Sequence, residues 1–186
     1  MANEKSETCS VKNEHRVFHN SNNNNNNNNN KEYVKRHDGL AKIIHQKLIE
    51  AAELIDDKSP HYKYNRSILT DNTIPFNRPD ITFMNKKTKN TFSIDIAVPN
   101  THNLAKTITD KQNKYQELAN EMCAMWKQKV AQLIPLVISS TGVIPKSLSQ
   151  SLTRLNLHHN TYIYIQLQKS VILGTCSIVC NFLNSK

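Results

Sequence analysis

Hydrophobic and polar residues alternate most clearly in two short segments, residues 81–84 and 91–98. Both are rich in β-branched and aromatic residues, and such alternation is typical of strands with one buried face. The polar residues 85–90 between them predict a hairpin that closes symmetrically about Lys87 and Thr88. In that register residue 84 pairs with residue 91 and residue 80 pairs with residue 95. A shift by one residue would mix the two faces.

This register predicts one apolar and one polar face on the hairpin. Asp80 and Asp95 then lie opposite each other, with Cβ atoms about 5 Å apart. Like charges so placed are destabilising, and a divalent cation held between them would remove that cost. The alternative interpretation is that Asp80 only begins a strand and Asp95 is an exposed strand residue. The apolar face comprises Ile81, Phe83, Phe92, Ile94, Ile96 and Val98, and the polar face Asp80, Thr82, Ser93, Asp95 and Ala97.

A helix after the hairpin is predicted from Thr107 to about residue 127. Thr107 and Asp110 have the spacing of a capping box at its start. Lys111 lies four residues before Tyr115 and continues the apolar stripe toward the sheet, whereas Lys114 borders that stripe. We therefore expect a lysine of this helix near the two aspartates.

The other periodic segments predict a mixed sheet with helices on its faces, and hence a mixed α/β fold. Residues 161–165 alternate and would also fit the start of a strand. The predicted segments are a helix over 33–55, a first strand over 66–70, a buried strand over 133–140, and helices over 147–157 and 162–183.

The N-terminal residues 1–30 differ in composition from the rest of the chain. They include an uninterrupted asparagine tract, Asn22–Asn30. Such a tract buries no apolar area, so we expect a disordered tail followed by a folded domain over residues 31–186.

Charge and cysteine content narrow the class of partner. The formal net charge is +9, and no acidic residue follows Glu121. A basic surface favours polyanions, although a solvated basic surface without a partner is common. The four cysteines have no C-x-x-C spacing. Cys176 and Cys180 have the spacing of a helical zinc pair, but no second pair of histidines or cysteines completes such a site, so buried core residues are the favoured interpretation. The N-terminus is too polar for a signal peptide, and the apolar run 171–183 is too short to span a bilayer. We expect an intracellular protein without a membrane partner.

Three motifs together resemble the restriction-like endonuclease domain of non-LTR retrotransposons. They are Arg36–Asp38, Arg78–Asp80 followed by Asp95, and Lys111–Tyr115, and the likeness covers roughly residues 31–183. It implies a restriction-endonuclease-like mixed central sheet flanked by helices, placed after the reverse transcriptase in those elements. It also implies nuclear nicking of target DNA with Mg²⁺ or Mn²⁺, which primes reverse transcription.

The resemblance assigns roles residue by residue. Asp80 and Asp95 become the catalytic metal ligands. Restriction-type nucleases usually carry a lysine where this chain has Ala97. In the retrotransposon group the lysine comes from the following helix, so Lys111 or Lys114 takes its role. The apolar stripe favours Lys111, and adjacency to a tyrosine favours Lys114.

Further residues are expected at the DNA: Arg36, His37, Arg78 and Tyr115. The alternatives are that Arg36 and His37 brace the site, that His37 forms a structural bond at a helix start, and that Arg78 pairs with an acid. DNA is the expected partner, the RNA of the element is an alternative, and no small-molecule cofactor is expected.

The chain has neither a polymerase nor the zinc knuckle usual in these elements. We therefore expect a fragment, a solitary domain or the product of a decayed element. Two other functions stay open: a catalytically idle nucleic-acid-binding remnant, and a structural fragment without a present function.

Overall fold

The computed structural model of the protein describes residues 24–51, 62–64, 68, 78–85, 89–157 and 161–184. The first 23 residues, most of the predicted strand 66–70 and hairpin-loop residues 86–88 lie outside this range. The elements are α1 (Asn24–Ala51), β1 (Tyr62–Tyr64), β2 (Ile81–Asn85), β3 (Asn90–Ala97), the 3₁₀ turn η1 (Thr101–Asn103), α2 (Leu104–Lys114), α3 (Gln116–Met125), β4 (Val130–Val137), α4 (Lys146–Arg154) and α5 (Tyr162–Asn184).

The four strands form one mixed sheet in the order β1-β2-β3-β4. β2 is antiparallel to both β1 and β3, whereas β4 runs parallel to β3. The predicted hairpin register is confirmed, because Ile81 pairs with Ile94 and Met84 pairs with Thr91. The mixed α/β architecture expected from the sequence is therefore present.

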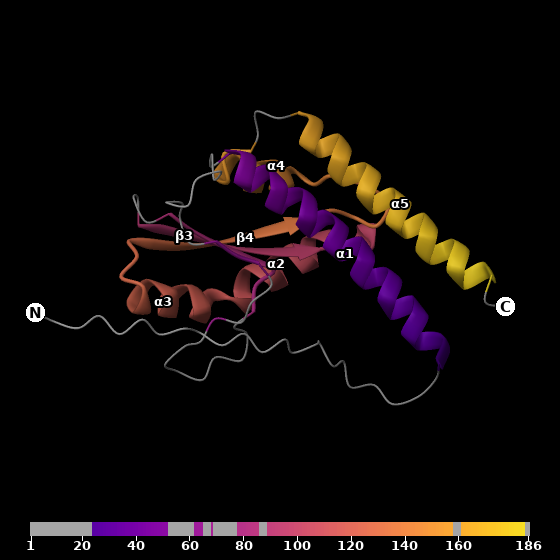
Figure 1. Cartoon of the computed structure of the whole chain (residues 1–186), viewed down its shortest axis with the longest axis horizontal. Coiled ribbons are helices and arrows are strands. Elements are labelled where there is room, and N and C mark those ends of the chain that lie inside the picture. The colour runs from indigo at the N-terminus through magenta and orange to yellow at the C-terminus, as the bar shows by residue number, and fades with distance from the viewer. Residues whose placement is uncertain are drawn as a thin grey trace, which may run out of the picture.

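The crossover from β3 to β4 consists of α2 and α3, which cover one face of the sheet (Figure 1). β4 begins at Val130, three residues before the predicted start. Pro135 lies within it and is tolerated because β4 is a sheet edge in the described chain. The carbonyl of Pro135 accepts a hydrogen bond of 2.8 Å from Ser151 Oγ on α4, so this half of the edge is covered.

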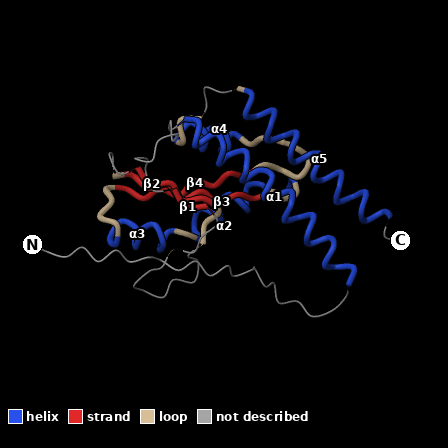
Figure 2. The backbone as a smooth tube through the Cα atoms, viewed as in Figure 1, coloured by secondary structure: helices blue, strands red, loops and turns tan. Residues whose placement is uncertain are grey.

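The opposite face of the sheet packs against α1, α4 and α5, which gives three layers (Figures 1 and 2). This is the predicted apolar face of the hairpin, and Ile81 and Ile94 are fully buried in it. A smaller cluster on the α2–α3 side contains Ile68, Tyr115, Leu118 and Met122. The predicted polar face is therefore also covered, since Ser93 is buried and its hydroxyl contacts Met122 Sδ at 3.5 Å.

Three local predictions were wrong. α1 begins at Asn24, inside the asparagine tract, because a helix packed along its later turns extends outward at one hydrogen bond per residue. α2 begins at Leu104, directly after η1, so Thr107 is an interior helical residue and not a cap. Residues 62–64, which lie between the predicted helix 33–55 and the predicted strand 66–70 and were not expected to form a strand, form the edge strand β1.

The single helix predicted from Thr107 to residue 127 is divided at Tyr115. This residue has φ −113° and ψ 16°, outside the helical region, and it caps the start of α3. The amide of Ala119 donates to its carbonyl at 3.0 Å. The division turns α3 relative to α2 and lets Tyr115 reach the sheet.

α5 is longer than its apolar C-terminal run suggested. It has 23 residues, and its most apolar window has a mean hydropathy of 1.3, so by length and composition it could cross a membrane. Core helices of globular proteins meet the same criterion. One face of α5 is buried, through Ile163, Leu167, Val171 and Ile178.

Candidate functional site

Asp80 and Asp95 lie together on the α2–α3 face of the sheet. The β2–β3 register places Asp80, the residue before β2, opposite Asp95. Both are buried, with 5% and 3% of their surfaces exposed. The interpretation of Asp95 as an exposed strand residue is therefore wrong. Burying two carboxylates is unfavourable unless each is compensated, so their partners define the site.

Asp80 is held by a backbone amide and by an imidazole. Its Oδ2 accepts a hydrogen bond of 2.7 Å from the amide of Ile96 on β3 and lies 3.1 Å from His37 Nε2 on α1. Asp80 directly precedes Ile81, the first paired residue of β2. Its carboxylate accepts the hydrogen bond from the Ile96 amide that a backbone carbonyl would accept if β2 were longer. The carboxylate thus continues the hydrogen bonding between β2 and β3 by one residue beyond the end of β2.

His37 lies in the middle of α1, so the interpretation as a helix-start histidine is wrong. Its Nδ1 lies 3.2 Å from Asp38 Oδ1, while its Nε2 contacts Asp80. Burial lowers the pKa of His37, but the hydrogen bonds and charges of Asp80 and Asp38 outweigh burial and raise the pKa above its ordinary value. Two carboxylate partners favour the doubly protonated imidazolium, which donates from both nitrogens.

Asp95 forms an ion pair with Lys111 of α2, in the crossover between β3 and β4. Lys111 Nζ at the end of α2 lies 2.5 Å from Asp95 Oδ2. The contact lies outside regular hydrogen-bond geometry, so this buried oxygen relies on the charge of Lys111. The hydroxyl of Tyr115 lies 3.5 Å from Asp95 Oδ1 and 3.2 Å from the carbonyl of Arg78, and it can donate to either.

The two aspartates have opposite pKa shifts. Burial raises the pKa of Asp80, but the hydrogen bond and charge of His37, the amide of Ile96 and the charge of Lys111 reverse the effect and lower it. Burial also raises the pKa of Asp95, and the charge of Asp80 raises it further. Lys111 and Lys114 oppose this rise without overcoming it. The two carboxylates therefore interact across the hairpin, as the register requires.

The two candidate lysines occupy different positions. Lys111 contacts the carboxylate of Asp95, as the apolar-stripe argument favoured. Lys114 Nζ lies 4.6 Å from the centre of the Tyr115 ring, and its charge acts on Asp95. Tyr115 is 3% exposed, so it contacts the site from within and does not present a surface to DNA.

Arg36 is buried between α1 and α5 and is 8% exposed. Its Nη1 donates to Thr175 Oγ1 at 2.9 Å, and its Nη2 lies 3.4 Å from the carbonyl of Val98 at the end of β3. A Cβ atom on Gly174 would lie 2.7 Å from Arg36 Cγ, so the glycine allows this close packing. This position fits the role in which Arg36 braces the site and does not contact DNA.

Arg78 is half-buried, and its backbone carbonyl accepts a hydrogen bond from the hydroxyl of Tyr115.

The oxygen atoms of Asp80 and Asp95 are the candidate ligands for a divalent cation. Within the described residues, no group of three or more histidine, cysteine, aspartate or glutamate side chains is arranged to hold a metal. Mg²⁺, however, is commonly bound by one or two carboxylates together with substrate phosphates and water. Asp95 Oδ2 is a buried oxygen whose contact with Lys111 lies outside regular hydrogen-bond geometry, and burial together with the charge of Asp80 raises the pKa of Asp95. The Asp80–Asp95 pair therefore fits such an ion.

The hydrogen bond from the Ile96 amide to Asp80 could not be predicted from the sequence, because backbone donors leave no signal in residue types.

Comparison with models of known protein families found no match, and comparison with curated proteins found none.

Proposed function

We propose that this chain is a restriction-endonuclease-like domain that nicks DNA with Mg²⁺ or Mn²⁺, in the manner of the endonuclease of non-LTR retrotransposons. One observation carries the proposal: two buried aspartates from neighbouring strands lie opposite each other, and a lysine from the following helix pairs with one of them. The basic chain, with its formal charge of +9, supports a nucleic-acid substrate.

In this proposal Asp80 and Asp95 would hold the metal, and a backbone carbonyl near Ile96 is proposed as a third ligand. The bound ion would polarise the scissile phosphate and lower the pKa of an attacking water. The remaining residues hold this arrangement in place. His37 and the amide of Ile96 fix the orientation of Asp80, and Tyr115 fixes that of Asp95.

Lys111 has two roles in the proposal. In the absence of metal its charge compensates Asp95. With a divalent cation held by the two aspartates, the Lys111 ammonium group would orient the attacking water or stabilise charge that develops on the phosphate. Its side chain is 22% exposed, so the ammonium group lies at the solvent side of the pair.

The test is nicking of supercoiled plasmid with Mg²⁺, with Mn²⁺ and with EDTA. We expect metal-dependent conversion to the open circular form. Asp80→Ala and Asp95→Ala should each lose at least about 100-fold in rate, since a metal supplies several kcal/mol of transition-state stabilisation. Asp110→Ala removes an exposed carboxylate from α2 and should retain the rate.

A second pair of variants distinguishes the lysines. Lys111→Met should lose most of the nicking activity, whereas Lys114→Met should retain most of it. Nicking that persists in both aspartate variants would reject the proposed site. DNA binding by a wild-type protein that does not nick would instead identify a catalytically idle remnant.

A further inference from the structure

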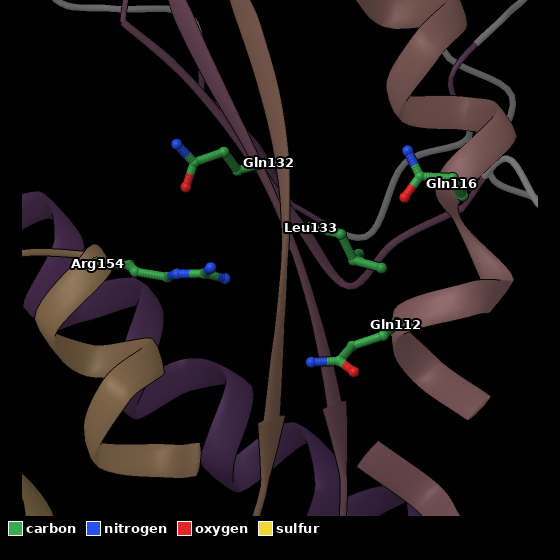
Figure 3. A pocket seen from close by; sticks show the side chains of 5 residues that line it. All are labelled: Gln112, Gln116, Gln132, Leu133 and Arg154. Atoms are coloured by element: carbon green, nitrogen blue, oxygen red, sulfur yellow. The ribbon is translucent and has the colours of Figure 1, made fainter. Parts of the chain in front are cut away.

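A groove crosses the exposed half of the edge strand β4. It has a volume of about 540 Å³ and is lined by Gln112, Gln116, Gln132, Leu133 and Arg154. This volume lies within the roughly 300–1,000 Å³ typical of small-ligand sites. Figure 3 shows Gln132 and Arg154 on one side of the strand and the other three side chains on the opposite side. Polar groups thus flank the strand from both sides.

The strand itself contributes polar groups to this groove. The carbonyl of Pro135 points away from β3, because it is bonded to Ser151 on α4. Backbone groups alternate between the two sides of a strand, so those of Leu133, two residues earlier, also face outward. No described strand pairs with this edge of the sheet.

The groove lies beside the Asp80–Asp95 site. Asp95 pairs with Pro135 in the parallel ladder, and Leu133 precedes Pro135 by two residues, or about 7 Å along the strand. Gln112 directly follows Lys111 on α2. A chain of nucleotides bound at Asp95 would therefore reach the groove within one or two nucleotides.

The chemistry of the lining favours a nucleotide over other ligands. It contains one positive charge, on Arg154, and no carboxylate, as a phosphate requires. A glutamine carboxamide offers a donor and an acceptor together, and it can bond bidentately to the edge of an adenine. Within the described chain, the three glutamines and Arg154 make no side-chain hydrogen bond to another residue, so these groups are available.

We propose that this β4-edge groove holds a nucleotide of the cleaved strand that flanks the scissile phosphate, with a glutamine on its base and Arg154 on its phosphate. The inference rests on the proposed endonuclease function and adds a source of sequence preference to it. Leu133 supplies the apolar contact with the sugar or base.

The first experiment measures binding without cleavage. Fluorescence anisotropy of a labelled single-stranded oligonucleotide is recorded in EDTA over a series of salt concentrations. Arg154→Ala should weaken binding and reduce the slope of log affinity against log salt by about 0.7, because one phosphate contact is lost. Lys146→Ala removes an exposed cation from the same helix and should leave affinity and slope close to wild type.

The second experiment measures base preference. Nick sites are sequenced on a pool of duplexes with randomised sequence, using wild type, Gln112→Ala, Gln132→Ala and their double variant. Loss of a bidentate base contact should reduce the preference at one flanking position by roughly 5- to 100-fold. Gln150→Ala, an exposed glutamine on α4 outside the groove, should retain the wild-type preference.

The outcomes separate this inference from the function on which it rests. If wild type does not nick, the endonuclease proposal fails, and the anisotropy data still decide whether the groove binds the oligonucleotide. If wild type nicks while the groove variants keep its affinity, salt slope and base preference, the groove inference is overturned. Gln112 and Arg154 are exposed, so their variants should fold, which thermal melting verifies.

Discussion

Asp80 and Asp95 have the same side chain, similar burial and positions opposite each other, yet their pKa values are shifted in opposite directions. The difference lies in their partners. Asp80 receives a backbone amide and an imidazole in hydrogen-bond geometry. Asp95 depends on the charge of one partly exposed lysine and a long contact with a tyrosine. Asp80 is therefore held by hydrogen bonds from the backbone and from His37, while Asp95 is held mainly by the charge of a partly exposed side chain.

The largest expected effect comes from removing the cation of Asp95. Lys111→Met should lower the free energy of unfolding by roughly 2–3 kcal/mol at pH 7 without metal. This is less than the about 3–5 kcal/mol for breaking a fully buried pair, because Lys111 is 22% exposed. Urea denaturation measures the change. Lys114→Met is the matched control, and an equal loss in both variants would contradict the specific pairing.

Asp80→Asn should lower the free energy of unfolding by a smaller amount, about 1–2 kcal/mol. The variant weakens charge-assisted hydrogen bonds that are each worth roughly 1.5–3 kcal/mol. It also relieves the repulsion with Asp95, which offsets part of this loss. The pKa of Asp95 should fall in this variant, since the charge of Asp80 raises it in wild type. Carboxyl-carbon NMR titration measures that pKa. An unchanged value would show that the two carboxylates do not interact.

Asp95→Asn should change the free energy of unfolding in the opposite direction and stabilise the metal-free protein. The folded-state pKa of Asp95 is raised, so its ionisation reduces stability as pH rises above about 3.9, the ordinary value for aspartate. A gain of about 1 kcal/mol would raise Tm by roughly 2–4 °C in a domain of this size. The gain should disappear near pH 3, and calorimetry at both pH values tests this. A lower Tm at pH 7 would contradict the comparison.

The smallest effect concerns pH and His37. Its pKa is raised in the folded state, so its contribution is complete below about pH 6.5 and is lost as pH rises through the folded-state value. The lowered pKa of Asp80 means that the same contact is lost as pH falls below about 3.9. The stability difference between wild type and His37→Gln should therefore be greatest near pH 5, at about 1 kcal/mol. A difference that does not change between pH 5 and pH 8 would show that the imidazolium is not involved.

The hairpin and its carboxylate pair were predictable because a period of two fixes both register and face. Once Ile81 and Ile94 must share the core face, Asp80 and Asp95 must share the other. The contact of Lys111 followed from a helical spacing of four residues between it and Tyr115. These features depend on local patterns, and such patterns are what a single sequence records.

Other features depend on contacts between distant segments and leave weak signals. The buried position of Arg36 requires Gly174, 138 positions later in the sequence, to leave space for its side chain. The division at Tyr115 follows from the packing of this residue against Asp95 and the carbonyl of Arg78, which overrides a continuous helical pattern. The groove residues have no common spacing, since they come from α2, α3, β4 and α4.

The parallel crossover also determines the order in which the site can assemble. A hairpin such as β2–β3 closes within microseconds, because its strands are adjacent in sequence. Lys111 joins only when α2 docks and β4 completes the parallel ladder, which is a slower, non-local step. Until then the newly formed hairpin carries two opposed carboxylates without their lysine. We therefore predict that the Asp80–Asp95 pair slows early folding, and faster refolding of Asp95→Asn than of wild type at neutral pH would support this prediction.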